Sequence, residues 1–524
     1  MDTNWDSTNV FDLRCDEHPF KDVMEPSDLP LAIANIRIDP GLPVPIYQQL
    51  CSKLRDAIIV GDLPPGTRIP TSRELSVSLG VGRNTVVTAY SQLAAEGYLA
   101  TNRRRGTEVA RLLLNSRVFD EEAGSRSKTD ELKSARSNVV EISFRARQNL
   151  QTEHVTEPRN GAFSLYAPDP SLFPRNPLGR LLAEEFGRAS CSDMATAKQR
   201  FQAALAAYLR HRRGVCCAPE QIIPVASMAS ALNLALQAIA DPGHCAAVED
   251  PAAPFVRQAF ASEGMRVLPL PSDAAGADAQ RWSGPPPRMI FVSPSVGCPL
   301  GRQLTEDRRT ELLRFSEQAN AVIFEADVSW ELSYQNNRLR ALQGQDQSGR
   351  VLYFGDMNET LGPHIRIGYL VVPSGLRDAF QELANRAGYG PDSFILAAVA
   401  RFMEENQYPL HVRSARASYA QRLEAMVRAC NNCLPGATVM EPAGGLHLTI
   451  LLPDNVDESA VSRLSALQGL PVAPLSSFYQ GASRKRGIVL AFGTIAERNI
   501  EMAARRLAGI VAQSATPLEL VATR

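Results

Sequence analysis

Short apolar segments alternate with longer amphipathic ones from about residue 141 to the end of the 524-residue chain. Segments with helical spacing include 197–213 and 307–319. The apolar segments predict strands at 246–250, 288–293, 321–327, 351–355 and 367–372. Strands that alternate with helices of about ten or more residues are typical of βαβ units. This pattern predicts an α/β domain with a mainly parallel sheet over residues 141–524.

The preceding segment, 41–112, has a different pattern: three predicted helices followed by two short strands. The first helix is expected over 46–62, with Leu50 and Leu54 among its apolar positions, and Leu63-Pro64-Pro65-Gly66 ends it. A capping box, Thr71-Ser72-Arg73-Glu74, begins a second helix that reaches Leu79. After a turn with two glycines, Arg83 begins the third helix. Its inward-facing residues are expected to be Val86, Ala89, Tyr90 and Leu93. Two short helices joined by such a turn are a helix-turn-helix arrangement.

Charge is distributed unevenly along a chain whose net charge is only −1. Residues 41–112 carry nine Lys and Arg against five Asp and Glu, whereas residues 1–40 carry three against nine. A basic module inside a neutral protein indicates a nucleic-acid partner, although most basic clusters are solvated surface. We expect the acidic segment 1–40 to be mostly disordered and the polar segment 113–140 to be a flexible linker.

Several classes of protein are excluded at this stage. No apolar run is long enough to span a bilayer, and the acidic N-terminus is not a secretory signal. Nine cysteines are too few for a disulfide scaffold and suggest a cytoplasmic protein. The pair Cys430 and Cys433 has no second pair or nearby histidine, so we expect two incidental thiols at a helix end and no metal site.

Segment 41–112 resembles the winged helix-turn-helix of the GntR regulator family. The resemblance rests on Leu63-Pro64-Pro65-Gly66, Thr71-Ser72-Arg73-Glu74, Arg83-Asn84-Thr85-Val86 and Arg105-Gly106-Thr107. It implies that the third helix enters the major groove of double-stranded DNA and that the hairpin, or wing, approaches the minor groove. An arginine at the start of that helix suits guanine or phosphate, and a basic wing suits the negative minor groove. The DNA-contacting residues implied are Arg73, Arg83, Asn84, Thr85, Arg103, Arg104, Arg105 and Gly106.

Residues from about 160 to 515 resemble fold-type I aminotransferases, as fused to GntR modules in MocR-type regulators. Landmarks include Tyr166 to Pro170, Arg213-Gly214-Val215, Glu249-Asp250-Pro251 and Arg366-Ile367-Gly368-Tyr369. The resemblance implies a pyridoxal-phosphate site and a head-to-tail homodimer. Such a dimer would bind an operator with repeated half-sites, and the large domain could sense a small-molecule effector.

Several of the residues that hold pyridoxal phosphate in this family do not recur here. Seven residues before Arg366, the position of the Schiff-base lysine is Glu359, and a carboxylate cannot form an imine. In the family, an acid faces the pyridine nitrogen of the cofactor, and a tyrosine lies near that acid. The corresponding positions of this chain are Ala326 and Val328. If the correspondence is shifted by one residue, Asp327 takes the role of this acid. Adjacent strand residues point to opposite faces of a sheet, however, which argues against such a shift.

The other two cofactor contacts are weakened as well. The position of the aromatic residue that stacks on the cofactor ring is Ala253. The segment that corresponds to the phosphate-binding segment is Ser227-Met228-Ala229. Arg366 survives as a phosphate-side cation, unless it forms a structural ion pair. We therefore expect no covalently bound cofactor and no catalytic residue. The alternative for Glu359 is a solvated or cavity-lining carboxylate without a role. The candidates for a ligand pocket are Arg366, Glu359, Asn358, Asp327 and Ser227.

Three hypotheses follow. The favoured one is a DNA-binding transcription regulator whose aminotransferase-like domain dimerises and binds a small ligand non-covalently. The alternative is a pyridoxal-phosphate-dependent aminotransferase that carries a DNA-binding domain, and the missing lysine argues against it. In the third, the large domain only dimerises. The likeness of fold cannot decide between them, because one fold hosts many functions.

Overall fold

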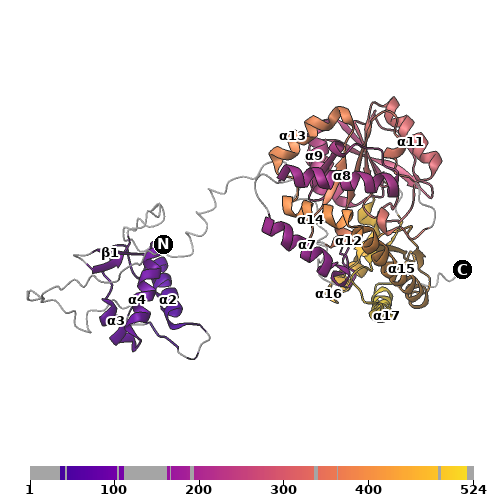
Figure 1. Ribbon diagram of the computed structural model, residues 1–524. Helices are drawn as coiled ribbons and strands as arrows, with labels where there is room; N and C mark the ends of the chain where they lie inside the picture. The colour runs from indigo at the N-terminus through magenta and orange to yellow at the C-terminus, as the bar shows by residue number, and fades with distance from the viewer. Residues whose placement is uncertain are drawn as a thin grey trace, which may run out of the picture. The chain divides into compact units, whose positions relative to one another are not determined.

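The computed structural model describes residues 33, 36–39, 41, 44–102, 106–110, 162–165, 167–188, 194–335, 340–362, 364–481 and 485–515. The chain divides into two compact units, Met1–Val139 and Val140–Arg524, which are treated separately below (Figure 1). The expected linker 113–140, the wing arginines Arg103, Arg104 and Arg105, and Tyr166 lie outside the described residues. So does most of segment 1–40.

The N-terminal unit contains three helices and one hairpin. Their bounds are α2 Ile46–Val60, α3 Ser72–Leu79, α4 Arg83–Ala95, β1 Leu99–Asn102 and β2 Gly106–Val109. Helices α2 and α4 pack through Leu50, Leu54, Val86 and Leu93, all of which are buried. The predicted helix-turn-helix and its inward-facing residues are therefore confirmed.

The ends of the first two helices follow from local sequence. In the capping box of α3, the Thr71 side chain accepts from the Glu74 amide at 3.3 Å, and the Thr71 amide donates to Glu74 at 2.8 Å. Helix α2 ends at Val60, two residues earlier than predicted. The reason is Gly61, whose φ of 92° places it in the left-handed region that terminates helices.

This unit also extends further toward the N-terminus than the predicted boundary at residue 41. Ile33 and Ile36 are buried in its core, and the Asp39 amide donates to the Gln49 side chain at 3.1 Å. Within the segment that is expected to be mostly disordered, two isoleucines three residues apart thus bury their side chains against the helices. The acidic composition of the segment hid this short apolar pattern.

The second unit is built on an eight-stranded sheet in the order β3-β10-β9-β8-β7-β4-β5-β6. Strands β4, β5, β7, β8 and β9 are mutually parallel, and β10 runs antiparallel between β3 and β9. This confirms the mainly parallel sheet. The strands are β3 Ile222–Val225, β4 Cys245–Asp250, β5 Arg266–Asp273, β6 Gly276–Ala277, β7 Met289–Val292, β8 Val322–Ala326, β9 Val351–Asp356 and β10 Gly368–Val371.

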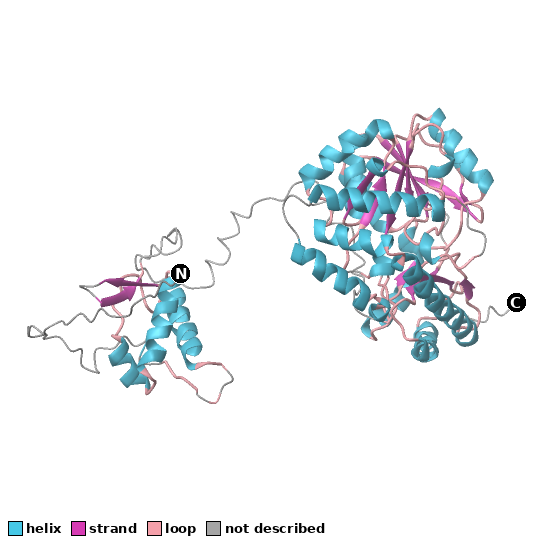
Figure 2. Ribbon diagram, viewed as in Figure 1, coloured by secondary structure: helices cyan, strands magenta, loops and turns pink. Residues whose placement is uncertain are grey.

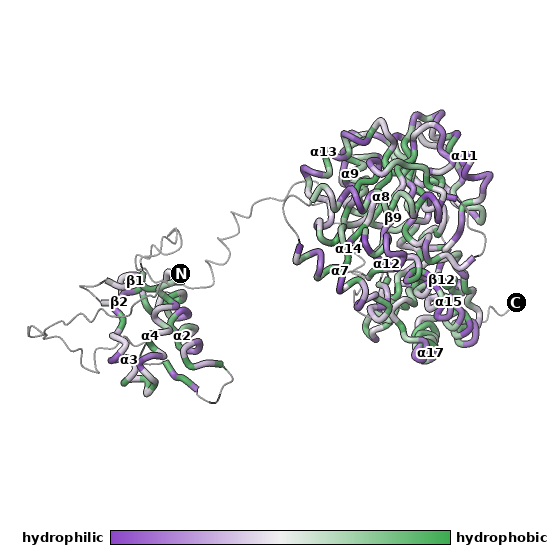
Figure 3. The backbone as a smooth tube through the Cα atoms, in the orientation of Figure 1, coloured by the Kyte–Doolittle hydropathy of each residue, from purple (hydrophilic) through white to green (hydrophobic). Residues whose placement is uncertain are grey.

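Helices cover both faces of this sheet (Figure 2). Helices α9 Met228–Ile239, α10 Pro254–Ser262 and α13 Arg377–Ala387 pack on one face. The other face is covered by α8 Met194–Arg213 and α11 Glu306–Gln318, and α14 Ser393–Glu404 and α7 Arg175–Arg188 pack in turn beyond α8. Strand alternation divides the strand side chains between the faces, so Phe354 packs toward α9 and Tyr353 toward α8. Hydrophobic residues accordingly concentrate in the interior around β9 (Figure 3).

A smaller antiparallel sheet completes the second unit, in the order β11-β12-β14-β13. It packs against α15 Gln407–Cys433, α16 Glu458–Leu467 and α17 Glu497–Gln513. Its strands are β11 Thr438–Met440, β12 His447–Leu451, β13 Ala473–Pro474 and β14 Gly487–Ala491. Cys430 and Cys433 lie in the last turn of α15, and the described residues contain no cluster suited to a metal ion. None of the helices described is both long and apolar enough to cross a membrane.

Candidate functional site

The first turn of α4 presents polar side chains to solvent. Arg83 and Asn84 are exposed and Thr85 is half-buried, while the next residue, Val86, is fully buried. Arg73, on α3, is exposed as well. Neither guanidinium group has a hydrogen bond or ion pair to the described residues. The amide groups at a helix N-terminus and a free guanidinium together suit a phosphate or a base edge.

Two contacts hold α4 in place behind this surface. The buried Tyr90 hydroxyl donates to the Pro70 carbonyl at 2.9 Å, which ties α4 to the start of α3. Arg55 of α2 pairs with Glu96 at 2.6 Å, just beyond the end of α4. The polar turn is thus carried by a helix that is fixed on its opposite side.

Strands β1 and β2 form the predicted hairpin. They pair in antiparallel register from Leu99 opposite Val109 to Asn102 opposite Gly106. Gly106 has a φ of 82°, which a side chain would strain. The two strands confirm the hairpin of the wing, whereas its basic turn lies outside the described residues.

In the second unit, the strand register brings three of the candidate segments to one edge of the sheet. Gly368 of β10 pairs with Val225 of β3 on one side and with Asp356 of β9 on the other. Ser227 follows β3, Arg366 precedes β10, and Asn358 and Glu359 follow β9. These residues therefore come from adjacent strand ends, where open α/β sheets bind ligands.

Ser227 and Arg366 supply groups that favour an anion at this edge. Ser227 is the N-cap of α9, and its hydroxyl accepts from the Ser230 amide at 3.2 Å. Met228 occupies the first helical position behind it. Arg366 is exposed and forms no ion pair with the described part of the chain, so the structural ion pair considered for it is not formed there.

Glu359 lies in the short helix α12 Asn358–Leu361 and is half-buried. Its Oε1 accepts from the Ser329 hydroxyl at 3.0 Å, whereas its Oε2 is shielded from solvent and has no partner. Burial, together with the nearby charge of Asp356, raises the pKa of Glu359 to about 8. The adjacent Asn358 also has an unpartnered, shielded oxygen, Oδ1.

Asp327 is not brought into this group. Its carboxylate accepts from Arg213 Nε at 2.6 Å and from the Tyr353 hydroxyl at 2.9 Å, on the face covered by α8. Ala326, one residue earlier, packs in the cluster on the α9 face. The alternation argument against a one-residue slip is therefore confirmed, and Asp327 serves a buried ion pair rather than the shared edge.

A covalently bound pyridoxal phosphate does not fit these residues. Of the two lysines beyond the linker, Lys198 lies on α8 and donates to Gln381 at 2.5 Å, and Lys485 is exposed before β14. Neither follows β9, where Glu359 stands instead. Ala253, at the N-cap of α10, offers no ring for stacking, and Ala326 offers no carboxylate.

Sequence reasoning missed a network of buried hydroxyls and carboxylates next to this edge. Tyr208 and Tyr408 donate to the two oxygens of Glu331, at 2.7 and 2.6 Å. Burial raises the pKa of both Glu331 and Asp356 to about 7. Tyr208 and Glu331 lie 123 residues apart along the chain, and their spacing gives no sign that they meet.

Two family models match the chain. The model for bacterial regulatory proteins of the gntR family matches residues 46–109, and the model for aminotransferase class I and II matches residues 182–507. The chain is 33% identical to the probable rhizopine catabolism regulatory protein MocR of Rhizobium meliloti over 465 residues, covering 87% of this chain and 92% of that protein.

The chain belongs to the MocR-type regulators of the GntR family. It is also 29% identical to the pyridoxine biosynthesis transcriptional regulator PdxR of Corynebacterium glutamicum, over 89% of this chain and 95% of that one. With its winged helix-turn-helix, this MocR-type chain is a DNA-binding transcription regulator, as predicted.

Solved structures establish the fold of the second unit. An archaeal alanine:glyoxylate aminotransferase superposes with a TM-score of 0.62 at 21% identity, over 71% of this chain and 96% of that one. Kynurenine aminotransferase of Pyrococcus horikoshii gives 0.61 at 23% identity, over 73% and 96%. The fold-type I architecture of the MocR-type chain is thereby confirmed.

Proposed function

We propose that the chain reads its operator through the first turn of α4. Arg83 and Asn84 contact base edges in the major groove, Thr85 lies beside them, and Arg73 anchors α3 on the phosphate backbone. The observation that carries this proposal is the exposure of these side chains on a helix whose opposite face is buried. Arginine suits guanine, and asparagine suits adenine.

The wing supplies the second part of the DNA contact. Gly106 begins β2, and Arg103, Arg104 and Arg105 would form the positive tip between the strands, where the minor-groove potential is negative. Phosphate contacts by these arginines make the affinity depend on salt. With one winged domain on each protomer of a dimer, the operator contains repeated half-sites.

The test is a competition experiment on the full chain. DNA is first selected from a random library, and the selected fragment is then titrated at low salt against random competitor. We expect the fragment to bind at least about a thousandfold more tightly than the competitor. Equal binding of both DNAs would refute sequence-specific recognition by the winged domain.

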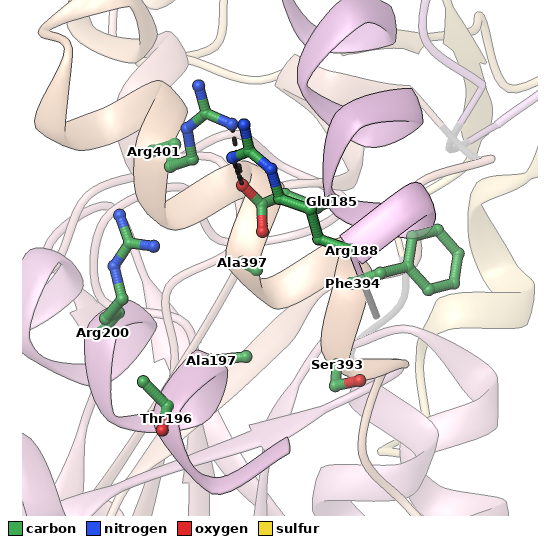
Figure 4. A pocket seen from close by; sticks show the side chains of 9 residues that line it. All are labelled: Glu185, Arg188, Thr196, Ala197, Arg200, Ser393, Phe394, Ala397 and Arg401. Atoms are coloured by element: carbon green, nitrogen blue, oxygen red, sulfur yellow. Dashed lines mark hydrogen bonds and ion pairs between the residues drawn. The ribbon is translucent and has the colours of Figure 1, made fainter. Parts of the chain in front are cut away.

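We further propose that the second unit forms the homodimer. Phe186, at the end of α7, is 69% exposed and packs edge-on against Phe394 of α14, with ring centroids 5.3 Å apart. The neighbouring hollow of about 470 Å³ is lined from α7, α8 and α14 by Glu185, Arg188, Arg200 and Arg401 (Figure 4). An exposed aromatic rimmed by charged side chains is typical of a protein interface.

The same unit acts without covalent cofactor chemistry. An aminotransferase needs a lysine for the Schiff base, and the position of that lysine carries Glu359. We therefore assign no aminotransferase activity to the chain. Instead, the residues at this edge of the sheet bind a small effector reversibly. Arg366 and Ser227 contact an anionic group of the effector, and Glu359 and Asn358 contact another part of it.

A further inference from the structure

One large apolar side chain lies within the polar surface of α4. The exposed residues of this helix follow one face, and they are Arg83, Asn84, Val87, Thr88, Ser91 and Ala95. Val87 is 43% exposed, whereas Val86, the residue before it, is fully buried. The side chain of Val87 therefore points away from the core of the N-terminal unit, on the side of the helix that carries Arg83 and Asn84.

The stability of α4 does not explain this valine. A β-branched side chain loses rotamer freedom in a helix, so alanine or a long polar residue suits an exposed position better. The exposed part of Val87 also gains nothing from burial in the core. Single apolar residues are common on protein surfaces, so the exposure of Val87 acquires meaning only from its neighbours.

Those neighbours are the residues that we propose to contact bases. Val87 follows Arg83 by four positions and Asn84 by three, and residues at these spacings lie side by side on a helix. With a rise of about 1.5 Å per residue, Val87 lies about 6 Å along the helix axis from Arg83. Successive bases are about 3.4 Å apart along DNA. A base that Val87 touches therefore lies within about two base pairs of the base that Arg83 contacts.

The residue after Val87 uses its hydroxyl proton within the helix. The Thr88 hydroxyl donates to the Asn84 carbonyl at 2.9 Å. This proton is therefore not available to a base edge, and the valine is the group that α4 presents one turn beyond Arg83.

The chemistry of a matching base follows from this apolar side chain. Base edges in the major groove present hydrogen-bond donors and acceptors, and the 5-methyl group of thymine is the apolar group among them. A valine against a donor or acceptor would shield it from water without replacing its hydrogen bond, which is costly. Against a methyl group, the same valine removes apolar surface of both partners from water.

We propose that Val87 reads a thymine of the operator through the 5-methyl group of that base. This inference rests on the proposed function, since it names a base that α4 recognises in each half-site. Arg83 and Asn84 recognise their bases by hydrogen bonds, whereas Val87 recognises this one by apolar contact. A cytosine at the same place presents an amino donor and no methyl group, so it is disfavoured.

The experiment removes the methyl group from one thymine at a time. Each thymine of the selected operator is replaced by deoxyuridine, which keeps the base pair and lacks only the 5-methyl group. Fluorescence anisotropy at one salt concentration measures the affinity of the full chain for each fragment. We expect one such replacement, within about two base pairs of the position where Arg83→Ala relaxes specificity, to weaken binding about three- to fivefold, as for one methyl group removed from water.

Substitutions then assign the effect to Val87. Val87→Ala removes both valine methyl groups and should weaken binding of the thymine operator by a similar factor, while losing its sensitivity to deoxyuridine at that position. Alanine favours the helix, so this variant should fold. Val60→Ala, which changes a 73% exposed valine at the end of α2, is the matched control and should keep the wild-type sensitivity.

Two results would overturn the proposal. One is a wild type that tolerates deoxyuridine at every position, and the other is a Val87→Ala variant that keeps the full sensitivity to it. Both are distinct from a failure of the proposed function, in which the wild type would bind the selected operator and random DNA equally.

Discussion

At the residue scale, the direction of a single side chain decides which acids of the second unit can meet a ligand. Asp327 and Ala326 are adjacent, but they lie on opposite faces of the sheet, and Arg213 holds the acid on the α8 side. The alternation of strands made this outcome predictable from sequence. The partner of Asp327 was not predictable, because Arg213 is 114 residues away along the chain.

Arg83 provides the sharpest test of DNA reading. If it contacts a base, Arg83→Ala should cost about 1–3 kcal/mol of operator binding and relax specificity at one position. Arg386→Ala, an exposed arginine of α13, is the matched control and should leave the affinity unchanged. Fluorescence anisotropy with the selected operator measures both. Equal losses at the operator and at random DNA would make Arg83 a phosphate contact only.

Glu359 gives a pH-dependent prediction. Its pKa is raised in the folded protein to about 8, so its neutral form favours the fold, and the free energy of unfolding falls as pH rises from its ordinary pKa through 8. Glu359→Gln removes this dependence. One pKa unit corresponds to about 1.4 kcal/mol, so the variant should gain at least about 1 kcal/mol relative to wild type between pH 5 and pH 8.5.

Chemical unfolding at several pH values measures this difference. Burial raises the pKa of Asp356 and Glu331 to about 7, and the variant keeps both carboxyls, so their contributions to the difference largely cancel. Glu382→Gln serves as the surface control and should follow wild type. A Glu359→Gln variant that tracks wild type at every pH would show that the carboxyl is not buried as described.

At the element scale, sequence predicts the beginning of α3 correctly but not the end of α2. The capping box of α3 was predicted and is formed. Helix α2 ends two residues before the end predicted from the Leu63-Pro64-Pro65-Gly66 turn, because Gly61 terminates it first. The short α12, which carries Glu359, could not be predicted as a helix because four residues give no periodicity.

The α3 cap should contribute measurably to the N-terminal unit. Thr71→Ala removes the side-chain acceptor for the Glu74 amide and should cost about 0.5–2 kcal/mol of unfolding free energy. Thr71→Ser keeps the hydroxyl and should cost less. Urea unfolding of the N-terminal unit, followed by circular dichroism, compares the two. Equal stability of both variants and wild type would mean that the cap adds nothing to this helix.

At the scale of the whole molecule, the order of strands and helices along the sequence predicts the architecture. It does not predict which side chains meet in the candidate site. The alternation of strands and helices predicted the parallel sheet, and the resemblance placed Glu359 and Arg366 near a cofactor position. The unpartnered oxygens and the Glu331 network depend on contacts between distant segments, such as Glu331 with Tyr408. Only the folded chain brings these together.

The dimer proposal leads to a paired substitution. Phe186→Asp places a charge on an exposed aromatic and should convert the dimer to a monomer, while Leu467→Asp, on the 85% exposed Leu467 of α16, should not. Light scattering on the full chain measures the mass of each. Proteolysis at the expected linker 113–140 should also release a fragment that stays dimeric. A dimeric Phe186→Asp variant would place the interface elsewhere.

In the function proposed above, the aminotransferase-like unit of this regulator works without an imine. The direct test is borohydride reduction of the full chain after incubation with pyridoxal phosphate, followed by peptide mass spectrometry. Glu359 supplies no nitrogen for the bond, so we expect no stoichiometric adduct in residues 351–366. Glu359→Lys should form at most a slow, weak adduct there, because Ala326 and Ala253 still lack the remaining contacts. A stoichiometric adduct within 351–366 of the wild type, or measurable transfer of an amino group by it, would contradict the account.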